Sequence, residues 1–412
     1  MRITTVVVGA GQAGLAMSHQ LRCRGIDHVL LERGRTANSW HTERWDSLRL
    51  LTPNWLSRLP GYPYRGPDPD GYMTASEVAA HLAGYRESIS APVYEGVEVT
   101  GVRRLGDGYL VSTNQGVWTC RTVVIATGAC SDSYVPALAA AIPHEVRQLT
   151  SLDYRSPGEL DEGGVLVVGA SSSGVQLADE IQRSGRQVTL AVGEHTRVPR
   201  TYRGRDIHWW LDAIGQLDER HDEVDDLTRG RRMLSLQLIG TPERRAVDLN
   251  ALSALGVRLM GRLAGVSGGL AQMSGSLVNM CVSADLKQGR LLDRLDEWAD
   301  VHRLECDGPP GDRPAPTVVP TPSNALDLTN GSIRTVIWAT GFRPRFPWLD
   351  DRFLDRKGQP LHEGGVAKVP GLYVLGFPFT RRRKSGFLDG VGPDAVDLAA
   401  HLQGHLDLRS TA

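Results

Sequence analysis

Two short glycine-rich segments have the residue types and the spacing of nucleotide-binding turns. They read GAGQAG at residues 9–14 and GASSSG at residues 169–174. The first glycine of such a turn permits a tight bend, the second lets the backbone approach a pyrophosphate, and the third lets a helix pack closely on a strand. The N–H groups at the start of that helix then bind phosphate oxygens. The sequence therefore predicts two dinucleotide sites.

Each turn is predicted to lie between a buried strand and a helix, with a second strand after the helix. The expected elements are at residues 3–8, 15–24 and 28–32 in the first unit, and at residues 165–168, 175–183 and 187–192 in the second. The units align without a gap, because Gly25 lies eleven residues after Gly14 and Gly185 lies eleven residues after Gly174. This complete strand–turn–helix–strand context makes the glycine motif a strong signal.

The two units differ at two positions that bear on the nucleotide each one binds. Glu32 ends the second strand of the first unit, where a carboxylate accepts hydrogen bonds from ribose hydroxyls, whereas Val192 has this place in the second unit. Ser171 replaces the glycine, Gly11, that permits the closest approach to a pyrophosphate. The first site therefore suits a dinucleotide with an unphosphorylated ribose.

Two arginines favour NADPH over NADH at the second site. A carboxylate at Val192 would repel a 2′-phosphate, and none is present there. Arg197 and Arg200 follow within a few residues, where guanidinium groups can bind that phosphate.

A second repeated pattern supports a two-domain α/β fold. TVVIATG at residues 122–128 and TVIWATG at residues 335–341 are typical of strands buried on both faces, and their small last residues let the chain pass close to a cofactor. We expect two Rossmann-like dinucleotide-binding domains, with an NADPH domain inserted into an FAD domain. The predicted parts are residues 1–156 and 323–412 for FAD, and residues 157–322, with a helical insertion, for NADPH. The proline-rich residues 309–322 are the expected crossover.

Three further segments have recognisable patterns. A capping box from Thr74 to Glu77 predicts a helix to about residue 89. Residues 257–263 are typical of a strand, and residues 284–302 of an amphipathic helix. Pro393 suits the first turn of a C-terminal helix.

Composition narrows the class of protein. The net charge of -1 gives no argument for nucleic acid or an anionic membrane as a partner. No segment has the length and apolarity of a membrane span, and the chain opens directly on a strand pattern, so we expect a cytoplasmic protein without a signal peptide. The five cysteines form no CxxC pair, which indicates structural thiols and no metal site.

Together these motifs resemble the flavin-containing monooxygenase-like family of class B flavoprotein monooxygenases. The residues that carry the resemblance are the two glycine turns, Glu32-Arg33, the two ATG strands, WATGFRP at residues 338–344 and SGFLDGVGPDA at residues 385–395. One family signature, FxGxxxHxxx(Y/F), is degraded, because only its aromatic end survives as Tyr154. The family also places an asparagine near the flavin, for which Asn54 is the nearest candidate although its register differs.

The resemblance implies a reaction, its cofactors and its partners. NADPH would reduce FAD, the reduced flavin would form a C4a-(hydro)peroxyflavin with O2, and this species would oxygenate a small organic substrate by N-, S- or Baeyer–Villiger-type chemistry. A homodimer is an open option. Two alternatives stay open: an NADPH-dependent flavoprotein reductase with a protein or quinone acceptor, and a flavin-binding redox sensor without oxygenase activity. A thiol–disulfide reductase would need paired cysteines.

The candidate residues follow from the motifs and from the resemblance. Asn54 is the candidate catalytic residue. The resemblance implies that Trp40 covers part of the flavin and that the start of the C-terminal helix faces its pyrimidine ring, where the helix dipole would stabilise reduced anionic flavin. The candidate cofactor-binding residues are Gly9, Gly11, Gln12, Ala13, Gly14, Glu32, Arg33, Trp40, Val99, Thr127, Gly128, Gly169, Ser171, Ser172, Ser173, Gly174, Arg197, Arg200, Thr340, Gly341, Asp389 and Gly392.

Overall fold

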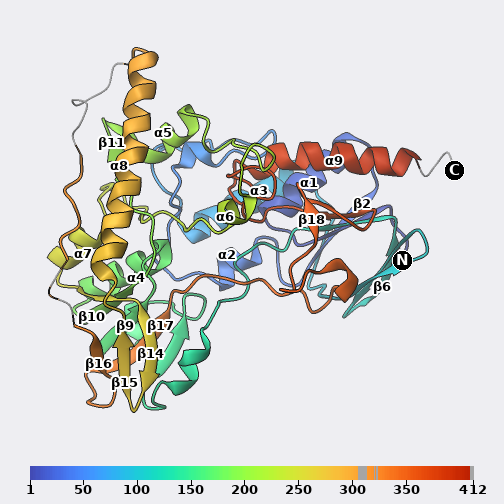
Figure 1. The fold of residues 1–412 in the computed structure, drawn as a ribbon. Helices are drawn as coiled ribbons and strands as arrows, with labels where there is room; N and C mark the ends of the chain where they lie inside the picture. Colours follow the sequence, from blue (N-terminus) through green and yellow to red (C-terminus); the bar gives the residue numbers. More distant parts are fainter. Residues whose placement is uncertain (305–312, 320, 322, 409–412) are drawn as a thin grey trace.

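Two β-sheets organise the chain, one for each glycine turn (Figure 1). The second is parallel throughout, whereas the first has a parallel central part and an antiparallel edge formed by residues 362–367. The structure is a computed structural model that describes residues 1–304, 313–319, 321 and 323–408. The predicted crossover at residues 309–322 therefore lies partly outside the described residues. The predicted α/β fold with two Rossmann-like units is confirmed.

The first sheet has seven strands, with β1 at its centre between β7 and β2. Helices α1, α3 and α9 cover one face, and a small antiparallel sheet covers the other. Alternate residues of β1 serve the two faces, since Val7 joins the helical core and Val6 and Val8 join the opposite core. In spatial order the strands are β18 (His362–Glu363), β19 (Val366–Ala367), β20 (Leu372–Val374), β7 (Thr122–Ile125), β1 (Thr5–Val8), β2 (His28–Glu32) and β3 (Val93–Glu95).

The elements around the first sheet agree with the sequence patterns. The helices are α1 (Gln12–Cys23), α3 (Ala75–Ser88) and α9 (Val391–Leu408), and the small sheet consists of β4 (Val99–Leu105), β5 (Gly108–Thr113) and β6 (Gly116–Cys120). The predicted capping box is present, with Thr74 and Glu77 exchanging side-chain and backbone hydrogen bonds at the start of α3. The short elements α2 (Asn38–Thr42) and η1 (Asn54–Leu56) lie in the connection between β2 and α3.

The second sheet repeats this layout with five parallel strands. They are β13 (Arg258–Gly261), β10 (Val188–Val192), β9 (Gly164–Val168), β17 (Ile333–Trp338) and β8 (Arg147–Thr150). Residues of α4 (Ser172–Arg183), α7 (Leu249–Ala254) and the start of α8 (Leu277–Val301) form one core against it. The other face packs against η2 (Ala137–Ala141), β14 (Leu263–Ser267), β15 (Leu270–Met273) and β16 (Ala325–Asp327).

Strand membership corrects the predicted domain boundaries. β8 precedes residue 157 and β17 follows residue 322, yet both belong to the second sheet, where β17 lies between β9 and β8. The boundaries at 156/157 and 322/323 therefore divide this sheet. The prediction placed them by the glycine unit and the proline-rich segment, whereas the sheet recruits one strand from each flanking segment.

The repeated ATG pattern has a structural explanation. β7 pairs with β1 in the first sheet, and β17 pairs with β9 in the second, so each ATG strand lies beside the strand that leads into a glycine turn. A Cβ atom on Gly9 would be 2.7 Å from the carbonyl oxygen of Ala126, and one on Gly169 would be 2.4 Å from that of Ala339. The small residues thus allow strand and turn to approach closely.

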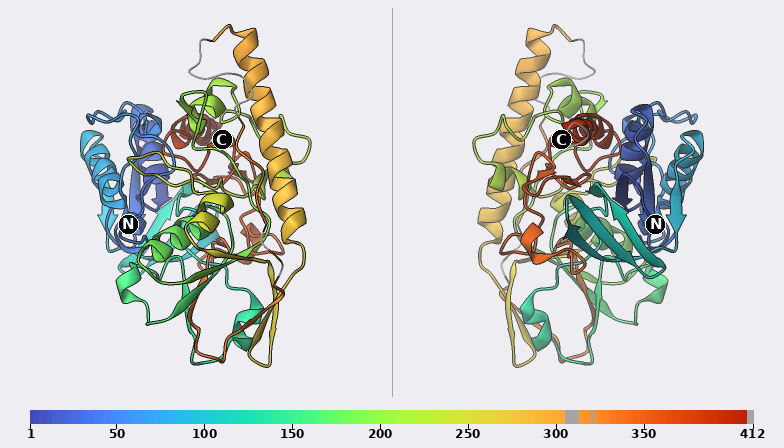
Figure 2. Two further views of the ribbon diagram at one scale, coloured as in Figure 1. Left: turned by 90° about the vertical axis from the view of Figure 1, so that its left-hand side faces the viewer. Right: turned by 90° about the vertical axis from the view of Figure 1, so that its right-hand side faces the viewer.

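A helical region follows β10 in the chain. It contains α5 (Ile207–Ala213), α6 (Leu227–Arg231) and the long helix α8, which extends along one side of the molecule past α5 (Figures 1 and 2). Helix α8 begins seven residues earlier than the predicted residue 284, because Leu277 and Cys281 continue its buried stripe. The remaining short elements are β11 (Thr201–Tyr202), β12 (Arg205–Asp206), η3 (Pro157–Glu159) and η4 (Asp351–Phe353).

Candidate dinucleotide sites

The first glycine turn has the shape that a pyrophosphate requires. Gly9 has φ +103°, and a Cβ atom on Gly14 would lie 2.0 Å from the carbonyl oxygen of Gly9. Gly11, at the N-cap of α1, instead faces open space, since a Cβ atom on it would have no heavy atom within 4 Å. Among the described residues no side chain caps α1, so its first N–H groups remain available beside this open space.

Glu32 joins the end of β2 to this turn. Its carboxylate accepts the backbone N–H of Ala10 at 2.9 Å and that of Gly34 at 3.0 Å. Each carboxylate oxygen has a further lone pair, so the side chain fits the predicted role toward a ribose. Arg33 pairs with Glu43, while Trp40 is half-buried with the Arg44 guanidinium 5.2 Å from its ring.

The start of α9 lies beside the start of α1. A Cβ atom on Gly376 would be 2.5 Å from Ala13 Cβ and 4.0 Å from Val391 Cγ1. This glycine therefore lies between the two helix starts and lets them approach each other closely. Gln12 Nε2 donates to the carbonyl oxygen of Gly386 at 3.5 Å. The positive ends of both helices are therefore on the same side of the first sheet.

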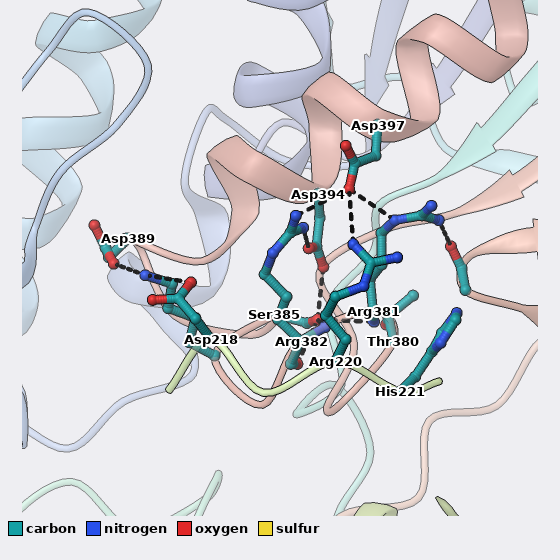
Figure 3. Close-up of polar contacts among 12 residues, drawn as sticks. Asp218, Arg220, His221, Thr380, Arg381, Arg382, Ser385, Asp389, Asp394 and Asp397 are labelled. Carbon is teal, nitrogen blue, oxygen red and sulfur yellow. Dashed lines mark hydrogen bonds and ion pairs between the residues drawn. The ribbon is translucent and has the colours of Figure 1, made fainter. Parts of the chain in front are cut away.

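Buried ion pairs hold the loop that leads into α9 (Figure 3). Lys384 is 5% exposed and its Nζ lies 2.7 Å from Asp389 and 3.0 Å from Asp218. Burial by itself lowers the pKa of Lys384, but these carboxylates raise it overall. Arg58 also donates to Asp389, at 2.6 Å. The predicted cofactor residue Asp389 is thus committed to two cations, and the basic run at residues 381–384 forms a network of ion pairs.

The second glycine turn has the same backbone geometry as the first. Gly169 has φ +111°, and a Cβ atom on Gly174 would be 1.8 Å from the carbonyl oxygen of Gly169. Ser171 is the N-cap residue of α4, and its side chain makes no capping hydrogen bond. The N–H groups at the helix start therefore have no side-chain acceptor and are available to the phosphates of a dinucleotide.

A segment distant in sequence lies along this second turn. Ser172 Oγ donates to Ser235 Oγ at 2.8 Å, and Gln237 Nε2 donates to the carbonyl oxygen of Ala170 at 2.7 Å. Gln237 is 1% exposed, and its Oε1 is without a partner among the described residues. Sequence reasoning missed Ser235 and Gln237, since no motif marks them.

The prediction that Arg197 and Arg200 bind a nucleotide phosphate is corrected by their surroundings. Both side chains are 2% exposed. Arg197 pairs with Asp248 at 2.5 Å and with Asp285 at 2.7 Å. Arg200 pairs with Asp206 at 2.7 Å and packs over the ring of Tyr72. Because carboxylates already neutralise these buried guanidinium groups, they are structural cations.

A different arginine lies open at the expected phosphate position. Val192 pairs with Gly261 in the second sheet, so Arg262 directly follows the strand beside β10, and its Cδ would be 3.8 Å from a Cβ atom on Gly193. Arg262 is exposed and lines a cavity of about 500 Å³ together with Glu194, Ser274 and Ser276. The sequence missed Arg262 because only strand pairing brings it to the end of β10.

Asn54, the predicted catalytic residue, serves its own loop. It is 4% exposed, its Nδ2 donates to the carbonyl oxygen of Asp68 at 2.9 Å, and its Oδ1 accepts the N–H of Met73 at 2.7 Å. Both ends of the amide are occupied, which corrects the prediction to a structural role.

The other predicted positions divide into open turns and core side chains. Gly128 and Gly341 have φ of +77° and +88° with open space at their Cβ positions. Thr127 precedes Gly128, and Thr340 donates to the carbonyl oxygen of Tyr134.

Val99 packs in the core under the first sheet and Tyr154 in the core of the second, so neither side chain is available to a cofactor. Ser173 lies in the first turn of α4, and Gly392 lies in α9, where its Cβ position is 3.1 Å from Pro60.

Comparison with known proteins agrees with this geometry. Residues 6–214 match the pyridine nucleotide-disulphide oxidoreductase family. The chain is 30% identical to an uncharacterized oxidoreductase CzcO-like protein of Geobacillus kaustophilus, over 98% of this chain and 99% of that protein. The chain belongs to the pyridine nucleotide-disulphide oxidoreductase family.

One further relative and one solved structure indicate which kind of flavoprotein this chain resembles. Indole-3-pyruvate monooxygenase YUCCA4 of Oryza sativa is 25% identical over 92% of this chain and 84% of that protein. The structure of a flavin-containing monooxygenase from Stenotrophomonas maltophilia superimposes with a TM-score of 0.69 at 22% identity. The match covers 98% of this chain and 99% of that one. The predicted resemblance to flavin-containing monooxygenases and the oxidoreductase class are confirmed, and FAD and NADPH are supported as the cofactors. In the described residues, no helix is long and apolar enough to cross a membrane.

Proposed function

We propose that this oxidoreductase is an NADPH-reduced, FAD-dependent monooxygenase that oxygenates a small organic substrate through a C4a-(hydro)peroxyflavin. The observation that carries the proposal is that the two glycine turns have the same backbone geometry, whereas the residues at their expected ribose positions differ. The first turn has the Glu32 carboxylate, and the second has Val192 and the open Arg262. Two different dinucleotides fit these two sites.

The first turn is proposed to hold FAD. The open space at Gly11 and the uncapped start of α1 suit its pyrophosphate, and the free lone pairs of Glu32 suit its adenosine ribose. Bound FAD would supply the redox chemistry, accepting a hydride and activating O2, while the protein supplies position and electrostatics. Gly9 and Gly14 set the turn that makes this position available.

The second turn is proposed to hold NADPH. The uncapped start of α4 suits its pyrophosphate, and Arg262 suits the 2′-phosphate as a charge-assisted donor. Glu194 lines the same cavity and opposes a phosphate by like charge. We infer that the preference for NADPH reflects the balance between these two side chains, and that NADH is accepted more weakly.

Two hydrogen bonds join segments that are distant in the sequence. Tyr72 donates to Asp206 at 2.7 Å, and Arg200 donates to the carbonyl oxygen of Leu51 at 2.8 Å. These buried contacts fasten the segment before α3 to the segment before α5. We propose that this junction limits the access of water to the flavin, which would favour transfer of oxygen to substrate over release of hydrogen peroxide.

The experiment measures where the electrons of NADPH go in the purified yellow protein. NADPH oxidation, O2 consumption and hydrogen peroxide release are measured together with a panel of amines, sulfides and ketones. The proposal expects one class of substrate to raise NADPH oxidation while peroxide release falls below one per NADPH. If every NADPH gives one peroxide with all substrates, while quinone or haem-protein acceptors accelerate the reaction, the chain is a reductase and the proposal fails.

A further inference from the structure

A completely buried carboxylate lies in the first turn of α9. Asp394 is 0% exposed, and its two oxygens accept Arg382 Nη1 and Ser385 Oγ, each at 2.6 Å (Figure 3). Burial raises the pKa of Asp394, although both partners oppose this change. An ionised carboxylate in such a place requires a neutralising cation, and Arg382 is the one in contact with it.

The position of this pair within α9 determines what its charges affect. A helix carries roughly half a positive charge at its N-terminus, and a carboxylate in the first turn cancels that charge for any group facing the helix start. Arg382 restores it by neutralising Asp394. The start of α9 lies beside the start of α1 around Gly376, on the side of the first sheet that holds the open glycine turn.

A second ion pair on the same helix provides a contrast. Asp397, at a position about one turn further along α9, accepts Arg381 Nε at 2.9 Å and Arg382 Nη2 at 3.0 Å. Its side chain is 30% exposed, so water screens its charge. Asp394 and Asp397 thus share an arginine and a helix but differ in burial and in distance from the helix start.

We propose that Arg382 is a positioning residue for flavin reduction, which neutralises Asp394 so that the start of α9 stabilises the negative charge of reduced flavin. Ser385 holds the carboxylate toward Arg382. The inference rests on the proposed function, since it needs FAD at the first glycine turn. It assigns the Arg382–Asp394 pair a role in setting the reduction potential of the flavin, beyond fastening the loop to α9.

The test is the midpoint potential of flavin in the holoenzyme, measured by equilibration with a reference dye. Asp394→Asn keeps the shape of the side chain and removes the buried negative charge, so that Arg382 keeps only its pair with the screened Asp397. Reduced flavin is therefore expected to bind about tenfold more tightly relative to oxidised flavin. A tenfold change corresponds to a potential raised by about 30 mV for two electrons. The double variant Arg382→Gln with Asp394→Asn removes both charges and is expected to return toward the wild-type potential.

Asp397→Asn is the matched control, because it removes the same charge from the same helix at the screened position. The proposal expects its potential to stay near that of the wild type. An unchanged potential in Asp394→Asn with FAD still bound, or an equal shift in Asp397→Asn, would overturn it. Absence of flavin from the wild-type protein, or failure of NADPH to reduce it, would instead count against the proposed function.

Discussion

Glu32 accepts the backbone N–H of Ala10 at 2.9 Å, which ties the end of β2 to the first glycine turn. In the second unit Val192 has the corresponding place and can make no such bond. The carboxylate therefore fixes the turn, and under the proposed function its free lone pairs are available to the ribose of FAD.

Glu32→Gln is expected to weaken FAD binding. The amide loses the charge and can no longer accept from both Ala10 and Gly34 without turning an N–H group toward one of them. Loss of a charge-assisted hydrogen bond of this kind costs about 1.5 kcal/mol, or about tenfold in the dissociation constant. Fluorescence titration of the apoprotein with FAD measures it. Glu43→Gln, which removes only the pair with Arg33, serves as the control, and equal affinities in the two variants would contradict the assignment.

Alanine substitutions at two glycines of the first turn are expected to change different properties, the stability of the apoprotein in one case and the affinity for FAD in the other. Gly14→Ala places Cβ 2.0 Å from a backbone oxygen, so the folded apoprotein should lose about 1–3 kcal/mol of stability. Gly11→Ala meets open space and should leave apoprotein stability unchanged, yet fill the position that a pyrophosphate needs. Thermal unfolding of both apoproteins, followed by FAD titration, separates the effects. Normal FAD affinity in Gly11→Ala would show that the pyrophosphate does not approach this position.

The nucleotide preference is expected to depend on Arg262 and Glu194 in opposite directions. Arg262→Gln should lower the ratio of kcat/KM for NADPH over NADH about tenfold, since one charge-assisted phosphate contact is lost. Glu194→Gln should raise the ratio, because a like charge is removed. Arg258→Gln, on the exposed first residue of β13, is the control and should leave the ratio unchanged. A ratio unaffected by Arg262→Gln would show that this arginine does not bind the 2′-phosphate.

The contact between Tyr72, Arg200 and Asp206 predicts a loss of stability in acid. Burial would raise the pKa of Asp206, but hydrogen bonds from His208 and the charge of Arg200 lower it to about 2, below the ordinary 3.8. A depressed carboxyl pKa stabilises the fold above the unfolded value and loses this contribution as pH falls from about 4 to 2. The contribution is about 2 kcal/mol. Asp206→Asn should therefore lower Tm at pH 7 and flatten its fall in acid. A parallel fall in both proteins would contradict this account.

Local patterns allowed the sequence to predict both nucleotide units. The glycine turns and the Thr74 capping box each depend on residues within a few positions of one another, and the strand β2 ends at the predicted Glu32. Chain-wide pairing was not predictable in this way. The boundary near residue 322 was wrong because β17 inserts between β9 and β8, a contact set by the sheet rather than by neighbouring residues.

The site predictions failed where a buried group met a distant partner. Arg197 reaches Asp248 and Asp285, which lie 51 and 88 residues away, so its charge was already satisfied. Arg262 reaches the end of β10, where the proposed phosphate position lies, only through the pairing of β13 with β10. An arginine in a sequence indicates a cation, but whether it is free depends on these long-range contacts.

The central claim, that NADPH-reduced flavin activates O2 in this protein, is tested most directly by stopped-flow spectroscopy. The holoenzyme is reduced anaerobically with NADPH and then mixed with oxygenated buffer. The account predicts an intermediate that absorbs in the near ultraviolet and decays slowly to oxidised flavin. Direct return to oxidised flavin, with one hydrogen peroxide for each flavin, would contradict it.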